Sequence, residues 1–264
     1  MDLGLQGKVV LVTGGSRGIG HAIAVQCAIE GADVAICART EAGLTDALDL
    51  LRTQGTRVFG HIADVTRSDE VTRLLRTSAE ALGGINILID NVGGSEGKGL
   101  IGSTDEEWMR TFDLNVLHAV RISRAVIPYM QQRGGGSIVI ISSISGYKPS
   151  PSVQYGSAKA AEIFLSSALA LELGPLQIRI NTVCPGSTLF PGGGWGRYQQ
   201  RHPEHFEQFQ REEFPLGRLA TPEEIARVVA FVASPAGGWI NGAMIPVDGG
   251  QQHPSAFQRG PIWK

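Results

Sequence analysis

The sequence predicts an α/β protein built on a doubly wound parallel sheet. Short apolar runs rich in valine and isoleucine alternate with amphipathic segments that end at glycine or proline. Strands that alternate with helices form parallel sheets, and strands buried on both faces are apolar throughout. A glycine-rich segment also follows the first apolar run. We therefore expect a single domain over residues 1–264, with about seven strands and helices on both faces.

In the first half of the chain, four apolar runs are expected to be strands: 8–13, 33–38, 57–62 and 86–91. Three segments between them have helical periodicity: 19–30, 41–54 and 68–82. The first two stop at Gly31 and Gly55, because glycine readily takes the conformation that ends a helix. Ser68 is expected to cap the third, since its hydroxyl can accept a hydrogen bond from a free backbone N–H.

In the second half, the expected strands are 137–142, 177–184 and 243–247. The expected helical segments are 104–132, 155–173 and 222–233. Gly174 and Pro175 end the second of these, because proline cannot continue a helix. Thr221 is the expected N-cap of the third, with Pro222 in its first turn.

The bulk composition excludes several classes of protein. The formal net charge is −2, charged residues make up 18% of the chain, and no dense basic run is present, so a nucleic-acid partner is not expected. Cys27, Cys37 and Cys184 lie in apolar runs and are expected to be buried thiols. No signal peptide or apolar stretch of membrane-spanning length is evident, so a cytoplasmic protein without a membrane partner is expected.

The segment after the first strand has the spacing of a dinucleotide-binding loop. It reads T-G-x-x-x-G-x-G over residues 13–20. Glycines let the backbone approach a pyrophosphate, which the N–H groups and dipole of the next helix stabilise. The residues expected to contact the cofactor here are Gly14, Ser16, Arg17, Gly18, Ile19 and Gly20. The alternative is a tight turn that binds nothing.

Two arginines favour NADP(H) over NAD(H) as the cofactor. The end of the second strand meets the adenosine ribose in dinucleotide-binding sheets, and an acidic residue there favours NAD. This chain has Arg39 at that point and Arg17 within the glycine loop. Guanidinium groups suit a 2′-phosphate. Two alternatives stay open: both arginines are simply solvated, or Glu41 pairs with Arg39 and weakens the preference.

Tyr155 and Lys159 are spaced to lie on one face of a helix. A phenol with an ordinary pKa of about 10 is a poor base at neutral pH, but an ammonium group beside it lowers that pKa. The pair can then exchange a proton with an alcohol or carbonyl oxygen. The spacing alone is more typical of a surface pair. Ser142 and Ser143, however, lie at the carboxyl end of the fifth strand, where ligands bind in open α/β sheets.

Together, these motifs resemble those of the short-chain dehydrogenase/reductase family. The resemblance covers about residues 5–250 and rests on TGGSRGIG, Asp64-Val65, DNVG at 90–93, Asn115, Ser143, Tyr155-x-x-x-Lys159 and Pro185-Gly186. It implies a Rossmann fold and hydride transfer between a nicotinamide cofactor and a carbonyl or alcohol carbon. It also implies a homo-oligomer, either a tetramer or a dimer.

The resemblance implies catalytic roles for four residues. Tyr155 would be the general acid in reduction and the base in oxidation, and Lys159 would lower its pKa and bond the nicotinamide ribose. Ser143 would orient the substrate carbonyl, whereas Ser142 would be structural. Asn115 would hold a water that links Lys159 to solvent; the alternative is a helix-kinking asparagine without a chemical role.

The resemblance also implies contacts that bind the cofactor. Asp64 and Val65 would contact the adenine, and Asn91 and Gly93 would pass close to the adenosine side. The residues that would border the nicotinamide are Pro185, Gly186 and Thr188. One position departs from the family, which usually has Asn-Asn-Ala-Gly where this chain has DNVG. Asp90 replaces an amide with a carboxyl group, which puts the usual strand-bridging hydrogen bonds in doubt.

The alternation of strands and helices fails over residues 187–220, which we expect to form a lid over the substrate. The segment holds three consecutive glycines, which indicate mobility, and the aromatic residues Phe190, Trp195, Tyr198, Phe206, Phe209 and Phe214. Some of these rings are expected to line the substrate pocket; the alternative for each is that it pins the lid to the body. Phe206 and Phe209 are expected on one face of a short helix. His202 and His205 are expected to be exposed rather than metal ligands.

The leading hypothesis is an NADPH-dependent reductase of a small-molecule carbonyl compound. An aromatic lid favours an apolar or ring-bearing substrate, and the pattern is similar to 3-oxoacyl carrier-protein reductases and to many alcohol and polyol dehydrogenases. The alternatives are an NAD-dependent dehydrogenase that oxidises an alcohol and a dinucleotide sensor without catalysis. The tail over 251–264, with Phe257 and Trp263, is expected to be a subunit contact or a frayed end.

Overall fold

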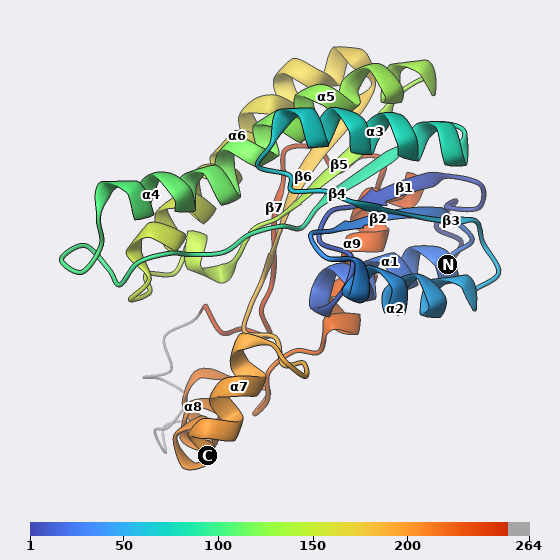
Figure 1. Ribbon diagram of the computed structural model, residues 1–264. Helices are drawn as coiled ribbons and strands as arrows, with labels where there is room; N and C mark the ends of the chain where they lie inside the picture. The colour runs from blue at the N-terminus through green and yellow to red at the C-terminus, as the bar shows by residue number, and fades with distance from the viewer. Residues whose placement is uncertain (253–264) are drawn as a thin grey trace.

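The computed structural model describes residues 1–252, and this part of the chain forms one seven-stranded parallel sheet (Figure 1). The strands are β1 Val9–Val12, β2 Asp33–Ala38, β3 Val58–Ile62, β4 Ile87–Asp90, β5 Gly136–Ile141, β6 Ile178–Pro185 and β7 Met244–Val247. Their order in the sheet is β3-β2-β1-β4-β5-β6-β7. The chain thus fills one half of the sheet and then the other, so the predicted doubly wound α/β fold is confirmed.

Helices cover both faces of the sheet (Figure 1). The helices of the body are α1 Gly18–Ile29, α2 Glu41–Arg52, α3 Ser68–Leu82, α4 Asp105–Phe112, α5 His118–Gln132, α6 Val153–Leu173 and α9 Pro222–Ala233. One core cluster packs α1, α2 and α9 on Val10 and Val12 of β1, and a second packs α3, α5 and α6 on Val9 and Leu11. Successive strand residues point to opposite faces, so a sheet covered on both sides requires strands that are apolar throughout.

The order of the strands determines where a ligand can bind. β1 pairs in parallel with β2 on one side and with β4 on the other. The helices that follow β1 and β4 lie on opposite faces of the sheet, which leaves a crevice beyond the carboxyl ends of these two strands.

The segment between β6 and α9, which was predicted to be a lid and keeps that name here, contains helices α7 Gly194–Arg201 and α8 Pro203–Glu213, which project from the sheet (Figure 1). The lid has a small apolar core of its own, made of Phe206, Phe214 and Leu219. Lys148 Nζ donates a hydrogen bond to Glu213 Oε2 (2.7 Å), which ties the end of α8 to the loop that follows β5.

Two local predictions differ from the structure. The N-cap of α3 is Arg67 rather than Ser68, and Arg67 makes no side-chain capping bond; the acidic residues Asp69 and Glu70 in the first turn favour this helix end through its dipole instead. The predicted helical region over 104–132 is two α-helices joined by a π-helical turn, Asp113–Leu117. Tertiary contacts of that turn, described below, stabilise it, and sequence periodicity does not reveal them.

Other predictions agree with the structure. Thr221 is the N-cap of α9, and its backbone N–H donates to Glu224 Oε2 (2.9 Å). Cys27, Cys37 and Cys184 are buried free thiols. Within residues 1–252, no helix has the length and apolar character needed to cross a membrane. Phe257 and Trp263, the candidate subunit contacts, lie outside the described residues.

Candidate active site

A groove of about 1000 Å³ lies at the carboxyl ends of β1, β2 and β4, where the strand order leaves a crevice. Every residue that the sequence analysis assigned to the glycine loop and to the adenosine side lines this groove: Gly14, Ser16, Arg17, Gly18, Ile19, Gly20, Arg39, Asp64, Val65, Asn91 and Gly93. Segments that are far apart in the sequence therefore meet at one surface that is large enough for a dinucleotide.

The glycine loop has the geometry that a bound pyrophosphate requires. Gly14 and Gly18 have φ values of +64° and +58°, in the left-handed region that favours glycine. A Cβ atom at Gly20 would clash with Asn91 Nδ2. Helix α1 begins at Gly18, so its free N–H groups and the positive end of its dipole lie at the groove. These residues fit the phosphates of a dinucleotide cofactor.

Asp90 and Thr13 bridge β1 and β4 beneath the groove. Thr13 Oγ1 donates to Asp90 Oδ1 (3.0 Å) and accepts from the backbone N–H of Asn91 (2.9 Å). The Asn91 amide donates to the carbonyl oxygen of Thr13 (3.0 Å). The replacement of asparagine by Asp90 had put the strand-bridging hydrogen bonds in doubt, but the Asp90 carboxyl group takes part in them.

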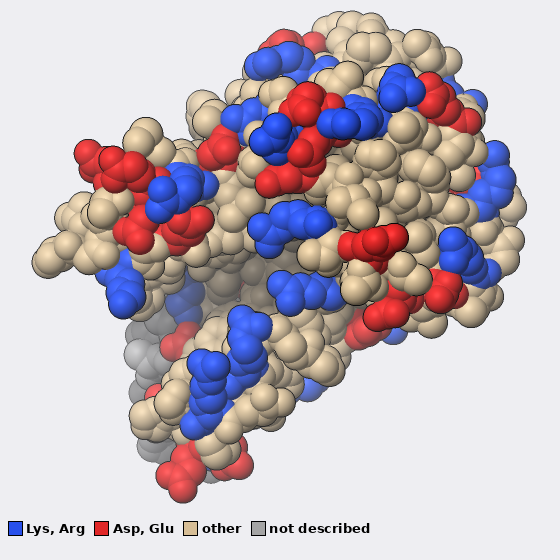
Figure 2. Space-filling view, in the orientation of Figure 1, with Lys and Arg blue, Asp and Glu red and all other residues tan. Residues whose placement is uncertain are grey.

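The adenosine end of the groove is positively charged. Arg17 and Arg39 are both exposed there, and within residues 1–252 neither forms an ion pair with an acidic residue, Glu41 included. Basic side chains flank the hollow between the body and the lid (Figure 2). Burial opposes ionisation of Asp64, but hydrogen bonds from Thr66, together with the charge of Arg39, lower the pKa of this carboxyl group.

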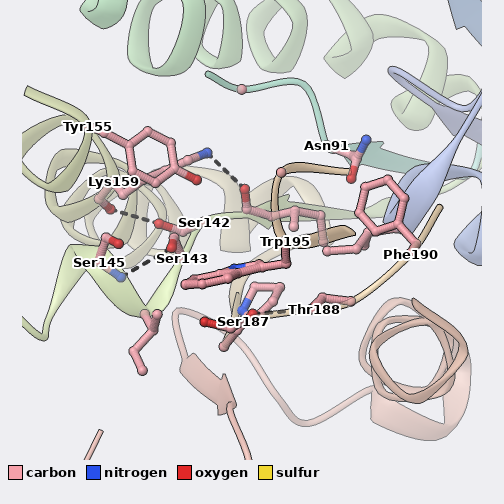
Figure 3. A pocket seen from close by; sticks show the side chains of 17 residues that line it. Asn91, Ser142, Ser143, Ser145, Tyr155, Lys159, Ser187, Thr188, Phe190 and Trp195 are labelled. Atoms are coloured by element: carbon pink, nitrogen blue, oxygen red, sulfur yellow. Dashed lines mark hydrogen bonds between the residues drawn. The ribbon is translucent and has the colours of Figure 1, made fainter. Parts of the chain in front are cut away.

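A smaller cavity of about 340 Å³ adjoins the groove and extends toward the lid. Ser143, Tyr155 and Lys159 line it together, and its wall includes the three predicted nicotinamide neighbours, Pro185, Gly186 and Thr188. Figure 3 shows the Tyr155 and Ser143 side chains beside the same space, with the Trp195 indole across from them. Tyr155 lines both the groove and the cavity, so it stands where a cofactor and a substrate would meet.

The two serines after β5 have different hydrogen bonds. The buried Ser142 donates its hydroxyl proton to the carbonyl oxygen of Lys159 (2.8 Å), which ties the strand to helix α6. Ser143 Oγ accepts a hydrogen bond from the Ser145 N–H (3.1 Å), so its own proton remains available to a substrate oxygen. Both serines line the cavity, but they differ in their hydrogen bonds: Ser142 is tied to α6, whereas Ser143 keeps a free donor.

Lys159 is among the largest fully buried side chains of the described residues, at 2% exposure. Its Nζ donates to the carbonyl oxygen of Ile141 (3.0 Å) and to Glu162 Oε1 (2.9 Å), and it lies 5.6 Å from the centre of the Tyr155 ring. Burial works against the charged form, but the carboxylate of Glu162 and the nearby Tyr155 outweigh it and raise the pKa of Lys159. An ammonium group is thus held beside the phenol, as the helical spacing predicted.

Asn115 lies behind the cavity, in the π-helical turn between α4 and α5. Its amide group donates to the carbonyl oxygens of Gly94 (2.7 Å) and Thr111 (2.6 Å), and Oδ1 accepts from the Gly94 N–H (3.2 Å). A Cβ atom at Gly93 would lie 2.8 Å from Lys159 Nζ and 2.9 Å from Asn115 Oδ1. Asn115 therefore fastens the strand β4 loop close to the lysine, and π-helical turns of this kind are frequent at functional sites.

The aromatic residues of the lid do not divide simply between the two roles left open, because several of them pack within the lid itself. Trp195 both lines the cavity and stacks on Phe209 of the lid core. Phe190 and Trp195 line the catalytic cavity, and Phe190 also packs against Gly18 of the glycine loop. The rings of Phe206, Phe209 and Phe214 pack into the core of the lid. Phe206 and Phe209 do share a helix, α8, as expected.

Sequence reasoning did not single out several residues near the site, of which four matter most here. They are Phe190 and Trp195, which it did not separate from the other aromatics, and His118 and Glu162, which it did not consider. Glu162 follows Lys159 by three positions on a helix, and this spacing could have identified it as a partner. His118 has no such signal, because only the tertiary fold brings α5 against β4.

His202 and His205 are exposed on the lid. In the part of the chain that the structure describes, no group of three or more His, Cys, Asp or Glu residues is arranged to hold a metal ion.

Comparisons with known proteins show which family the chain resembles. The family model described as enoyl-(acyl carrier protein) reductase matches residues 14–252. Dehydrogenase/reductase SDR family member 4 of Homo sapiens is 36% identical over 250 residues, which cover 93% of this chain and 88% of the relative. Isoepoxydon dehydrogenase of Penicillium expansum is 36% identical over 256 residues, which cover 95% of this chain and 96% of the relative.

Solved structures of dehydrogenases and reductases are also similar to this chain. L-Sorbose reductase from Gluconobacter frateurii, in complex with NADPH and L-sorbose, has a TM-score of 0.91 and 33% identity over 96% of this chain and 99% of its own. A 7α-hydroxysteroid dehydrogenase, in complex with NADH and 7-oxo glycochenodeoxycholic acid, has a TM-score of 0.88 and 30% identity over 94% of this chain and 96% of its own. The fold and the matches define an oxidoreductase that uses a nicotinamide dinucleotide. The chain belongs to the short-chain dehydrogenase/reductase family.

Proposed function

We propose that this protein interconverts a ketone and a secondary alcohol, with NADP(H) as its cofactor. The observation that carries the proposal is the position of Tyr155, which lines both the dinucleotide groove and the catalytic cavity, with the Lys159 ammonium group beside its ring. When bound, the cofactor supplies or accepts the hydride. The protein residues position the substrate and handle the proton.

Each catalytic side chain has a distinct part in the proposed reaction. In reduction, Ser143 donates a hydrogen bond to the carbonyl oxygen of the substrate, and Tyr155 transfers its phenolic proton to that oxygen as the alcohol forms. Lys159 stabilises the phenolate that remains. Asn115 holds the loop at Gly93 and Gly94 against Lys159, and it connects the lysine to solvent through a water. Oxidation of the alcohol runs through the same groups in reverse.

The preference for NADP(H) rests on the two arginines at the adenosine end. Arg17 and Arg39 form no ion pair within residues 1–252, and both line the groove. A 2′-phosphate is a dianion that guanidinium groups bind with charge-assisted hydrogen bonds. The L-sorbose reductase complex contains NADPH, whereas the hydroxysteroid dehydrogenase complex contains NADH, so relatives use either cofactor. NAD(H) with an oxidative direction is the second candidate.

The lining of the catalytic cavity favours an apolar or ring-bearing substrate. Phe190, Trp195 and Ile144 supply apolar surface, and polar groups are concentrated near Ser143 and Tyr155. The 7α-hydroxysteroid dehydrogenase complex contains 7-oxo glycochenodeoxycholic acid, a ring-bearing ketone. We therefore propose that cyclic or aryl ketones are better substrates than linear sugars. We also propose that the active protein is a homo-oligomer in the cytoplasm.

The test combines cofactor binding with a substrate screen. NADPH and NADH are titrated by fluorescence, and cyclic, aryl and 3-oxoacyl carbonyl compounds are then screened by the oxidation of each cofactor. The proposal expects tighter binding of NADPH and turnover of at least one ring-bearing ketone. Tight NADPH binding with no turnover of any carbonyl compound favours the sensor, and equal or tighter binding of NADH contradicts the cofactor assignment.

A further inference from the structure

A cluster of buried ionisable side chains lies behind the catalytic lysine. Glu162 on α6, Asp90 at the end of β4 and His118 on α5 are each only 1% exposed, and Lys159 is 2% exposed. Buried carboxyl groups are rare unless they are paired, because removing their charge from water is costly. A protein that keeps two of them beside its catalytic lysine therefore needs an explanation.

These side chains form two hydrogen-bonded pairs that interact with each other electrostatically. Glu162 Oε1 accepts a hydrogen bond from Lys159 Nζ (2.9 Å), and His118 Nε2 lies 2.9 Å from Asp90 Oδ1. Asp90 acts electrostatically on both Lys159 and Glu162, and His118 acts on Glu162. Three further polar atoms of the two pairs, Asp90 Oδ2, His118 Nδ1 and Glu162 Oε2, are buried without a hydrogen-bond partner in the described part of the chain.

The groups that face Glu162 come from four elements. Lys159, which also interacts with Tyr155, is on the same helix as Glu162, His118 is on α5, Asp90 is on β4 and Cys184 is on β6. Burial, with a contribution from the negative charge of Glu162, raises the pKa of Cys184 to about 12, so this thiol stays neutral. The charge that balances Glu162 most directly is therefore that of the Lys159 ammonium group.

Glu162 reduces both the hydrogen-bond donors and the positive charge that Lys159 can offer to Tyr155. An ammonium group has three N–H donors. One donates to Ile141 O and one to Glu162 Oε1, which leaves a single donor for the groove side. The carboxylate also cancels part of the positive charge that Tyr155 experiences, because it lies against the same Nζ atom. Burial raises the pKa of Glu162 above its ordinary value, and the Lys159 charge opposes this rise.

We propose that Glu162, supported by His118 and Asp90, is a positioning residue that fixes Lys159 in its buried place and sets the pH at which Tyr155 exchanges its proton. The inference deepens the proposed function and rests on Tyr155 and Lys159 as its proton-handling pair. With Glu162 ionised, the lysine favours the phenolate only in part. At any pH where Lys159 keeps its proton, neutralising Glu162 leaves the ammonium charge beside the phenol uncompensated, so the phenolate forms at lower pH.

The test follows the four tyrosines of the chain by NMR, with ¹³Cζ-labelled tyrosine, as a function of pH. The Tyr155→Phe variant assigns the resonance of Tyr155. In Glu162→Gln, which keeps an acceptor for Lys159 but loses the charge, the titration midpoint of Tyr155 is expected about one pH unit below that of the wild type. The matched control is Glu172→Gln, an exposed position on the same helix, which is expected to leave the midpoint unchanged.

An unchanged Tyr155 midpoint in Glu162→Gln, or a Tyr155 resonance that does not titrate below pH about 11 in either protein, contradicts the inference. If Glu162→Gln does not fold, Glu162→Asp takes its place. The shorter side chain draws the carboxylate away from Nζ, and a smaller downward shift is expected; no shift again contradicts the inference. This measurement does not use turnover, so it stands even if no carbonyl substrate is reduced, which would overturn only the proposed function.

Discussion

The dinucleotide groove and the adjoining catalytic cavity together form a cleft, and its two ends differ in how their charged side chains are placed. At the adenosine end, Arg17 and Arg39 are exposed and form no ion pair within residues 1–252. At the catalytic end, Lys159 and Glu162 are buried and bonded to each other. Exposed charges are screened by salt and can be exchanged at little cost to folding, whereas buried charges are screened weakly and depend on their partners. The comparison teaches that cofactor preference can be changed from the surface, whereas the proton chemistry is built into the core.

The largest expected effect is at the catalytic end. Tyr155→Phe removes the phenolic proton but keeps the ring, so we expect turnover of a ketone to fall by about three orders of magnitude. Cofactor affinity, measured by fluorescence titration, is expected to change little. Tyr198→Phe, on the lid helix α7, is the control and is expected to keep normal turnover. Turnover of Tyr155→Phe within tenfold of the wild type would exclude Tyr155 as the proton donor.

The next effect is at the adenosine end. Arg39→Leu is expected to weaken NADPH binding by about 10- to 100-fold, because one charge-assisted contact contributes about 1.5–3 kcal/mol. NADH binding is expected to stay the same, since NADH lacks the 2′-phosphate. Arg124→Leu removes an exposed arginine on α5 that does not line the groove, and it serves as the control. Equal losses for both cofactors would show that Arg39 does not bind a 2′-phosphate.

Between the two ends, the glycine loop tolerates no added volume. A methyl group at Gly20 would meet Asn91 Nδ2, so Gly20→Ala is expected to destabilise the protein by about 1–3 kcal/mol, although alanine is the better helix former. Gly194→Ala is the control, because no atom lies within 4 Å of a Cβ there. Denaturant unfolding compares the two variants. Similar stabilities would show that the loop can move apart without cost.

The smallest expected effect is a difference in salt dependence between NADPH binding and the titration of Tyr155. Raising the ionic strength from about 0.05 to about 0.5 M shortens the range of electrostatic interactions several-fold. We expect the dissociation constant for NADPH to rise a few-fold, because the arginines are exposed. The Tyr155 midpoint is expected to stay nearly constant, because Lys159 and Glu162 are buried. If salt changed the Tyr155 midpoint as much as it changed NADPH binding, the distinction between exposed and buried charges would be wrong.

Much of the fold could be predicted from the sequence because its signals are local. Apolar runs predicted all seven strands of the described chain, with boundaries within two residues. Helix α9 was predicted with its correct bounds, because Thr221, Pro222 and Glu224 form a capping pattern that acts within one turn. The π-helical turn at Asn115 could not be predicted, since its amide bonds to Gly94 depend on how two distant segments meet.

At the candidate site, too, local patterns could be predicted from the sequence, whereas contacts between distant segments could not. The glycine loop and the spacing of Tyr155 and Lys159 are short patterns with a direct physical meaning, and the structure places each of these residues at the cleft. The pairing of Asp90 with His118 joins a strand to a helix 28 residues later, and nothing local marks it. The lid aromatics could not be divided from sequence either, because burial in the lid core and exposure to the cavity require the same kind of side chain.

The central claim is that this cleft transfers a hydride, and the most direct measurement follows the hydride itself. NADPH that carries deuterium at C4, prepared separately in its two stereochemical forms, is incubated with a ring-bearing ketone and the protein, and the alcohol is analysed by mass spectrometry. We predict that one of the two forms delivers a single deuterium to the carbinol carbon. An alcohol without deuterium from either form, or no alcohol despite saturating NADPH, would contradict the account.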